Sequence, residues 1–316
     1  MLPPILSNRL CSLHEGEERN AISVIINLND NAKVIYYMIT KSLICSRVKG
    51  VYKEVDEILS GSASEVLVKK YWGFGDMMQD MSNLAKMLKL ERAKLGADTS
   101  NNEKRKFGFE DDKLIYEVEE ISASEIIIEE FMVLANRLVA SYFEDNCLPL
   151  IYRVQEAKKT RAGYDSVKRI HASLALTRYT HFTSPIRRLA DLKVHQVLSA
   201  HLNGASSAEI RHTFAKEIKE SAELATSREN RAEDIVKHCN NVCAEMLLSA
   251  LTPRELTADV VGLNYKKCPI FMLRDYKLCV NGRTRFEVNK GQKVTVMLSF
   301  NECINKFEAV SYKIVA

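Results

Sequence analysis

The sharpest local feature of this 316-residue chain is the segment Tyr179-Thr-His-Phe-Thr-Ser-Pro-Ile-Arg-Arg188. Ser184 followed by Pro185 is typical of a helix start, with Ser184 as the N-cap and Pro185 at the first helical position. An apolar stripe follows at helical spacing and ends before Asn203-Gly204, a pair that commonly terminates helices. The stripe consists of Ile186, Leu189, Ala190, Val194, Val197 and Leu198.

The two arginines of this stretch predict a phosphate site. Arg187 and Arg188 would lie in the first helical turn, where the macrodipole disfavours cations unless an anion joins them. The free N–H groups of the helix start, two guanidiniums and the hydroxyls of Thr183 and Ser184 would together hold a phosphate. Asp191 would lie on the same helix face and could orient one arginine. In the alternative interpretation, the arginines only form ion pairs with Asp191 and other acids.

Composition excludes several classes of protein. With 46% hydrophobic residues, 12 Gly and 6 Pro, the chain is neither collagen-like nor disordered. It has no apolar run of about 18 residues and no secretory signal pattern, so we expect a cytoplasmic protein without a membrane span. The eight cysteines include no C-x-x-C pair and are expected to be reduced and mostly buried. His238, Cys239 and Cys243 could face a metal on one helix, but core packing is the preferred interpretation.

Charge is distributed unevenly along the chain. Residues 110–130 hold nine acids and one base, whereas residues 151–200 hold ten bases and three acids. Aromatic residues lie among these bases, namely Tyr152, Tyr164, Tyr179 and Phe182. Cations interleaved with aromatics favour a surface for single-stranded nucleic acid, with a solvated helical face as the alternative.

Hydrophobic periodicity predicts further elements. Residues 21–28 and 33–40 form an expected hairpin around Asn29-Asp30-Asn31, and residues 113–119 form a short strand. Ser122 and Glu125 form a capping box at the start of a long helix. The expected helices are 49–59, 77–95 (ending at Gly96), 123–143 and, with breaks, Ser207 to about residue 250.

The C-terminal part changes to short strands, and a boundary is expected at Leu251-Thr-Pro-Arg254. The five expected strands are 256–261, 269–273, 277–280, 284–288 and 293–299. Five strands in about 60 residues are typical of a small OB-like barrel. The expected fold class is therefore α+β, with long helices followed by a β-barrel.

Five blocks stand out in order along the chain. They are Met1-Leu-Pro-Pro-Ile-Leu-Ser-Asn-Arg-Leu-Cys-Ser-Leu13, Ser46-Arg-Val-Lys-Gly-Val-Tyr-Lys-Glu-Val55, Ile128-Glu-Glu-Phe-Met-Val-Leu-Ala-Asn136, Pro149-Leu-Ile-Tyr-Arg-Val154 and His181-Phe-Thr-Ser-Pro-Ile-Arg-Arg188 with Asp191 and His195. Together they resemble the ribonuclease II / ribonuclease R (RNB-domain) exoribonuclease family. The resemblance implies a partial RNB domain at 1–250, with a mixed sheet and long helices. It also implies an OB-like RNA-binding barrel at 255–316.

The resemblance further implies 3′→5′ hydrolysis of single-stranded RNA to 5′-nucleotides. Arg187 falls on the family's arginine that holds the scissile phosphate, and Tyr52 falls on a tyrosine that stacks near the 3′-terminal nucleotide. The other expected RNA-binding residues surround Arg187, and Asp191 supports them. These residues are Ser184, Arg188, Tyr179, His181, Phe182 and Thr183.

The family's hydrolysis implies Mg²⁺, held by a D-x-D-D cluster. That cluster lies upstream of the block at Met1, so we expect this chain to lack it and to be inactive alone. Asp111-Asp112 and the acids Glu54, Asp56 and Glu57 lack the spacing of a substitute. Three further departures from the family pattern place the channel and the product-end pocket in question. Residues 155–170 replace a longer helical insert of the family, Val236-Lys-His238 replaces a charged stretch on the long helix, and Leu150 replaces a frequent aromatic residue.

Three hypotheses remain open. In the first, the chain is part of an exoribonuclease that needs a separately encoded, aspartate-bearing N-terminal half. In the second, it is a non-catalytic RNA-binding or scaffolding relative. In the third, it is a degraded gene fragment with exposed apolar strand edges.

Overall fold

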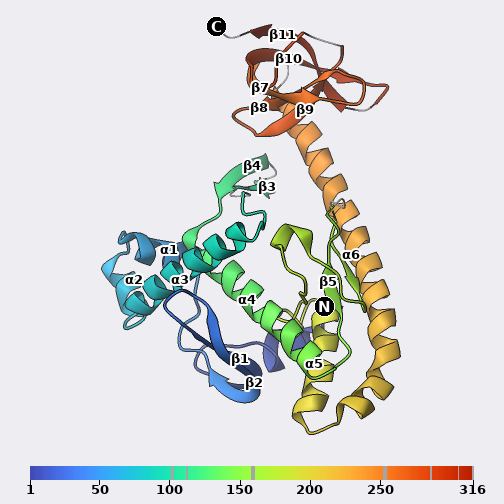
Figure 1. Cartoon of the computed structure of the whole chain (residues 1–316). Helices are drawn as coiled ribbons and strands as arrows, with labels where there is room; N and C mark the ends of the chain where they lie inside the picture. Colours follow the sequence, from blue (N-terminus) through green and yellow to red (C-terminus); the bar gives the residue numbers. More distant parts are fainter. Residues whose placement is uncertain are drawn as a thin grey trace. The chain divides into compact units, whose positions relative to one another are not determined.

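The computed structural model describes residues 1–100, 103–111, 113–157, 161–251, 255–284, 287–304 and 306–314. Two compact units make up the chain (Figure 1). The first unit comprises Met1–Asn102 and Ile121–Asn230, and the second comprises Glu103–Glu120 and Arg231–Ala316. No described helix is both long and apolar enough to cross a membrane.

The first unit is mainly helical. Its elements are η1, a π-helix (Leu6–Leu10), β1 (Glu18–Leu28), β2 (Val34–Cys45), α1 (Tyr52–Ser60), α2 (Glu65–Lys70), α3 (Gly75–Lys94), α4 (Ala123–Asp145), β5 (Tyr152–Val154), β6 (Gly163–Asp165), η2 (Ala172–Leu174), α5 (Leu189–Leu202) and the first part of α6 (Ser207–Leu251). The Ser122–Glu125 capping box at the start of α4 is confirmed.

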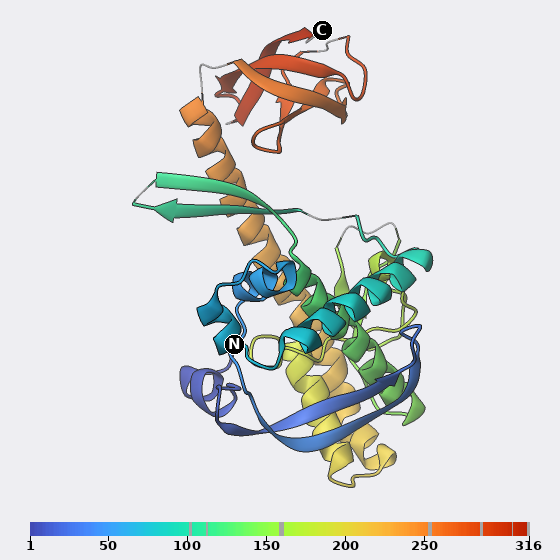
Figure 2. The ribbon, with the colours of Figure 1, turned by 90° about the vertical axis from the view of Figure 1, so that its left-hand side faces the viewer.

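The predicted N-terminal hairpin is confirmed and is longer than expected. β1 and β2 pair antiparallel, and one face of the ribbon, including Val24 and Ile39, packs into the core with Val139 and Phe143 of α4. Figure 2 shows this ribbon running across the helices of the unit. The turn forms because the Asn29 side chain accepts hydrogen bonds from the backbone N–H groups of residues 31 and 33.

Two expectations about the helices are wrong. Ser184 is not an N-cap, because Pro185 to Arg187 form a turn and α5 begins only at Leu189, with Arg188 as its extended N-cap residue. The helix from Ser207 has no break and runs 45 residues to Leu251. Its sequence contains neither Pro nor Gly, so nothing in the backbone interrupts it.

The expected α+β class is confirmed, but the sheet differs from expectation. The described strands of the first unit form two separate two-stranded antiparallel sheets, β1–β2 and β5–β6, rather than one mixed sheet. β5 and β6 have three residues each, and an isolated antiparallel bridge also joins Tyr152 of β5 to Thr180.

The second unit contains a closed barrel of five strands in the order β10-β11-β9-β8-β7. They are β7 (Glu255–Leu263), β8 (Pro269–Leu273), β9 (Leu278–Gly282), β10 (Lys293–Asn301) and β11 (Lys306–Ile314). All pairs are antiparallel except β11–β9. Leu248 and Leu251 at the end of α6 share the barrel core. The OB-like barrel is therefore confirmed.

The strand expected at 284–288 is wrong. Described residues 284, 287 and 288 are not in a strand, and 285 and 286 lie outside the described residues. The fifth strand is instead β11. Its register with β10 shifts at a bulge next to the pair Leu298 and Ala309, so its buried and exposed residues do not alternate regularly. Residues 252–254 of the expected domain boundary also lie outside the described residues, so the division into 1–250 and 255–316 stays a prediction.

The second unit also contains a hairpin that includes part of the acidic segment 110–130. The predicted strand 113–119 is β4 (Lys113–Glu120), and it pairs with an unpredicted β3 (Glu103–Glu110). Lys106 of β3 forms an ion pair with Glu119 at 2.7 Å. The charged side chains of β3 conceal its alternation in the sequence.

The cysteines are all free, but the expectation that most are buried is wrong. Only Cys268 is buried, and Cys239 and Cys243 are exposed and partly exposed on α6. The expectation that Cys239 and Cys243 pack into the core is therefore also wrong, because this part of α6 is exposed to solvent.

Candidate nucleic-acid interface

Residues 179–188 form an ordered loop that runs beside β5. The backbone N–H of Arg153 donates to the carbonyl of Tyr179 at 2.8 Å, and the Thr180 hydroxyl donates to the carbonyl of Ile151 at 2.6 Å. Thr180 is fully buried. These bonds fix the first half of the loop against the core of the first unit.

Asn136 of α4 holds the loop from a second side. Its side-chain N–H donates to the Tyr179 hydroxyl at 3.0 Å, and its carbonyl oxygen accepts from the backbone N–H of Phe182 at 2.9 Å. Asn136 is 0% exposed, so no water competes for these bonds. The patterns in the sequence did not single out this residue, although it closes the block 128–136.

His195 of α5 holds the same point of the loop. Its ring stacks on Phe182 with centroids 4.4 Å apart, and its Nε2 donates to the Phe182 carbonyl at 2.9 Å. Tyr179 and Phe182 are 3% and 6% exposed. In this conformation their rings are therefore packed against protein groups.

Asp191 orders the second half of the loop. Its Oδ1 accepts from the backbone N–H of Ser184 at 2.8 Å and from Arg188 at 2.7 Å. The predicted pairing of Asp191 with one arginine is thus present, and Arg188 is the arginine concerned. A turn closes beside it, since the N–H groups of Arg187 and Arg188 donate to the Ser184 carbonyl.

Arg187 differs from Arg188. It is exposed, its guanidinium contacts only the Ser184 hydroxyl at 3.4 Å, and no acid pairs with it among the described residues. Thr183 is exposed beside it. The rigid loop therefore presents one free guanidinium and one hydroxyl to solvent, and both can donate to a phosphate oxygen.

The surroundings of His171, and of His181 within the loop, lower the pKa of both rings and favour their neutral form. Burial, reinforced by Arg188 and Arg153, lowers the pKa of His181 to about 2. Burial and Arg153 lower the pKa of His171 to about 4. His181 Nδ1 lies 2.9 Å from the Tyr164 hydroxyl in a hydrogen bond. These rings therefore contribute packing and hydrogen bonds, and no positive charge.

The sequence profile described as "RNB domain" matches residues 1–162 and 158–204. This chain belongs to the RNB domain family. Ribonuclease R of Thermotoga maritima is 30% identical over 74% of the chain, and ribonuclease R 1 of Lactococcus lactis is 28% identical over 84%. The chain spans only 41% and 38% of the lengths of these two relatives.

Solved structures show the same fold. The apo form of Mycoplasma genitalium RNase R matches with a TM-score of 0.79 at 18% identity, over 98% of this chain and 60% of that one. An active-site variant of the Dss1 exoribonuclease from Candida glabrata matches with a TM-score of 0.78 at 15% identity, over 95% and 44%. Yeast Ssd1, a pseudonuclease, matches with a TM-score of 0.57 at 16% identity, over 95% and 44%.

In this RNB-family chain, Tyr52 lies apart from the loop. It is the first residue of α1 and is 49% exposed. Its carbonyl accepts from the Ser124 hydroxyl at 3.2 Å, which ties α1 to the start of α4. Within the described part of the chain, no hydrogen bond or ring contact joins Tyr52 to residues 179–188.

The basic segment 151–200 is largely neutralised by acids. Most of its described cations have partners: Arg153 pairs with Glu229, Lys168 and Arg178 with Glu144, Arg169 with Asp165 and Glu156, Arg188 with Asp191, and Lys193 with Glu217. Lys158 and Lys159 lie outside the described residues. Arg187 differs from these cations in having no acidic partner among the described residues.

The acids considered for Mg²⁺ do not fit a metal site. Glu54 accepts from Lys70 and the Tyr71 hydroxyl, both at 2.6 Å, and Asp56 accepts from the backbone N–H of Ser124 at 2.9 Å. Asp111 lies in the β3–β4 turn, and Asp112 lies outside the described residues. Among the described residues, no group of three His, Cys, Asp or Glu side chains could hold a metal.

Proposed function

We propose that this chain holds the phosphate backbone of single-stranded RNA through Arg187, as part of a 3′→5′ exoribonuclease of the RNB family. The observation that carries the proposal is the exposed Arg187 guanidinium, which has no described acidic partner and stands on a loop fixed from three sides. Because the loop is already ordered, little conformational entropy is lost when a phosphate binds.

The other residues of the loop have different roles in this proposal. Thr183 and Ser184 add hydroxyl donors beside Arg187, and Arg188 fixes the loop through Asp191. The buried rings of Tyr179 and Phe182 and the partly buried ring of His181 anchor the loop to the first unit. Tyr52, with half of its surface exposed, supplies the ring on which a base stacks.

Replacing Arg187 with alanine tests the phosphate contact. We expect about a tenfold loss of affinity for a labelled oligouridylate at low salt, since a hydrogen bond to a charged group is lost. The salt slope should fall by about 0.7, the value for one phosphate contact on a single strand. Fluorescence anisotropy at several salt concentrations measures both quantities.

Arg211→Ala is the matched control, because Arg211 is an exposed arginine of the same unit whose guanidinium, among the described residues, donates only to a backbone carbonyl. It should leave the affinity and the slope close to those of the unmodified chain. An Arg187→Ala variant with unchanged affinity and slope would overturn the role of Arg187.

For the hydrolysis itself, we propose that an aspartate-bearing partner is required, such as a separately encoded N-terminal half. The contacts of Glu54 and Asp56 support this, because both carboxylates already serve Lys70, Tyr71 and α4. Incubating the chain with Mg²⁺ and 5′-labelled RNA should yield no shortening. Release of mononucleotides would overturn the partner requirement and leave the phosphate contact standing.

A non-catalytic RNA-binding role is the second candidate. It is favoured by the shared fold of the pseudonuclease Ssd1, since the same architecture exists with and without nuclease activity. The two candidates separate when an aspartate-bearing RNB half is added in trans. Restored RNA shortening favours the enzyme, whereas RNA binding without shortening favours the second role.

A further inference from the structure

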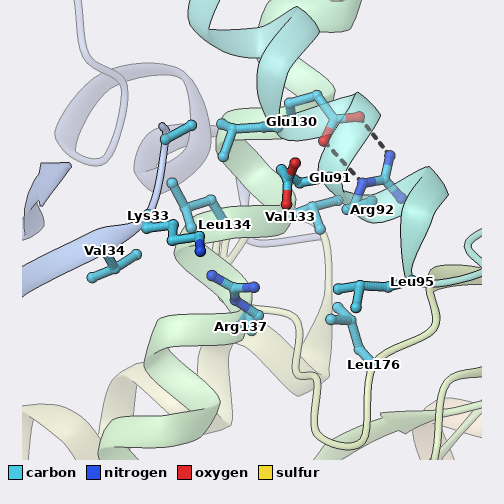
Figure 3. A pocket seen from close by; sticks show the side chains of 12 residues that line it. Lys33, Val34, Glu91, Arg92, Leu95, Glu130, Val133, Leu134, Arg137 and Leu176 are labelled. Atoms are coloured by element: carbon cyan, nitrogen blue, oxygen red, sulfur yellow. Dashed lines mark hydrogen bonds and ion pairs between the residues drawn. The ribbon is translucent and has the colours of Figure 1, made fainter. Parts of the chain in front are cut away.

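Two adjoining cavities lie in the first unit, and neither is lined by a residue of 179–188. The first has a volume of about 310 Å³ and the second about 390 Å³. Both are lined by Leu95, Arg137 and Leu176, so Arg137 of α4 stands at the boundary between them. Figure 3 shows the Arg137 and Lys33 side chains entering the first cavity.

Arg137 has no counter-ion among the described residues. The carboxylates of the first cavity already have partners, since Glu130 accepts from Arg92 at 2.9 and 2.5 Å and Glu91 pairs with Lys94 at 2.5 Å. Burial and the nearby positive charge of Arg178 both lower the pKa of Arg137. A partly buried guanidinium that has no counter-ion of its own, as Arg137 has none among the described residues, is unfavourable unless an anion joins it.

The lining of the second cavity supplies donors for such an anion. Arg178, Ser141 and Thr177 line it together with Arg137, and no described carboxylate does. Arg178 also pairs with Glu144 at 2.6 Å, which fixes the position of its guanidinium. Two guanidiniums and the Thr177 hydroxyl match the several acceptor oxygens of a phosphate group, whereas the Ser141 hydroxyl already donates to the Arg137 carbonyl at 3.2 Å.

The first cavity differs in having an apolar wall. Val34, Leu88, Val133 and Leu134 line it, and its volume is that of a small-ligand site. A ligand with a phosphate at one end and an apolar or aromatic group at the other would match both cavities.

We propose that Arg137 and Arg178 bind the phosphate of a small phosphate monoester whose organic group lies against the apolar wall of the first cavity. The site uses none of the residues assigned to RNA binding above, and it stands whether or not the chain takes part in hydrolysis. A mononucleotide and the terminal phosphate of an RNA both carry this chemistry.

Thermal unfolding of the full chain tests the site, with phenyl phosphate, adenosine 5′-monophosphate and inorganic phosphate at matched ionic strength. The two monoesters should raise the melting temperature more than inorganic phosphate does, because only they fill the apolar cavity. Arg137→Gln should abolish the shift and fold normally, since the charge it removes has no described partner. Arg211→Gln, the control, should retain the shift.

Calorimetry supplies a second measurement with Arg137→Lys, which keeps the charge and loses the planar fork of donors. We expect the dissociation constant for phenyl phosphate to rise about tenfold. Competition with phenyl phosphate by oligonucleotides that carry a 5′-phosphate or a 5′-hydroxyl identifies the source of the phosphate. If only the phosphorylated oligonucleotide competes, the natural ligand is an RNA terminus. If neither competes, it is a free monoester. The proposal is overturned if neither monoester shifts the unmodified chain, or if Arg137→Gln keeps the shift.

Discussion

Replacing Asn136 with leucine is expected to lower the free energy of unfolding by about 4 kcal/mol, because two buried partners lose their hydrogen bonds at about 1–3 kcal/mol each. Those partners are the Tyr179 hydroxyl and the Phe182 backbone N–H, at 3.0 and 2.9 Å. Leucine has the branched shape of asparagine and leaves no cavity, so the loss reports mainly the hydrogen bonds. Urea unfolding measures the change.

A double-mutant cycle separates this effect from general damage to the core. Tyr179→Phe removes the hydroxyl, which is one of the two buried groups that Asn136→Leu leaves without a hydrogen-bond partner. Its cost in free energy of unfolding should therefore be smaller in the Asn136→Leu background than in the unmodified chain. Equal costs in both backgrounds would contradict the assigned hydrogen bond. Hydrogen exchange gives an independent measurement, since the Phe182 amide should lose its protection in Asn136→Leu.

The loop should also lose stability in acid. Burial lowers the pKa of His171 to about 4 and that of His181 to about 2 in the folded chain, against about 6.5 when unfolded. The unfolded chain therefore binds more protons below pH 6.5, and stability falls as the pH falls. At pH 5 each histidine should cost about 2 kcal/mol relative to pH 7, or about 4 kcal/mol together.

Urea unfolding at pH 7, 6 and 5 measures this dependence. Arg188 and Arg153 lie near His181 and oppose its protonation, which adds to the effect of burial. His181→Gln should remove about 2 kcal/mol of the pH dependence, whereas His212→Gln, a change at an exposed histidine of α6, should leave it unchanged. Constant stability from pH 7 to pH 5 would show that the two rings are not buried as described.

Elements that depend on local interactions were predictable from the sequence. The Ser122–Glu125 capping box, the Asn29 turn and the hairpin it closes all rest on residues within about four positions of each other. β3 was missed because its alternating Phe107 and Phe109 stand among charged residues. β11 was missed because the bulge opposite Leu298 breaks its alternation.

The start of α5 illustrates the limit of local signals. Ser184-Pro185 is typical of a helix start, yet the helix begins at Leu189. The reason is that Asp191, inside α5, accepts the Ser184 N–H and the Arg188 guanidinium, which holds residues 184–188 as a turn. A contact that reaches back across seven residues outweighs the preference of the Ser-Pro pair.

The family and the order of helices and barrel followed from the sequence alone, and the sequence also predicted a phosphate contact at Arg187. Which side chains of the loop are buried depended on the tertiary structure. Tyr179 and Phe182 look like base-stacking aromatics in the sequence, but Asn136 and His195, distant in the chain, bury both. The physical reason is that burial depends on partners brought together by folding, and such partners leave no periodic trace in the local sequence.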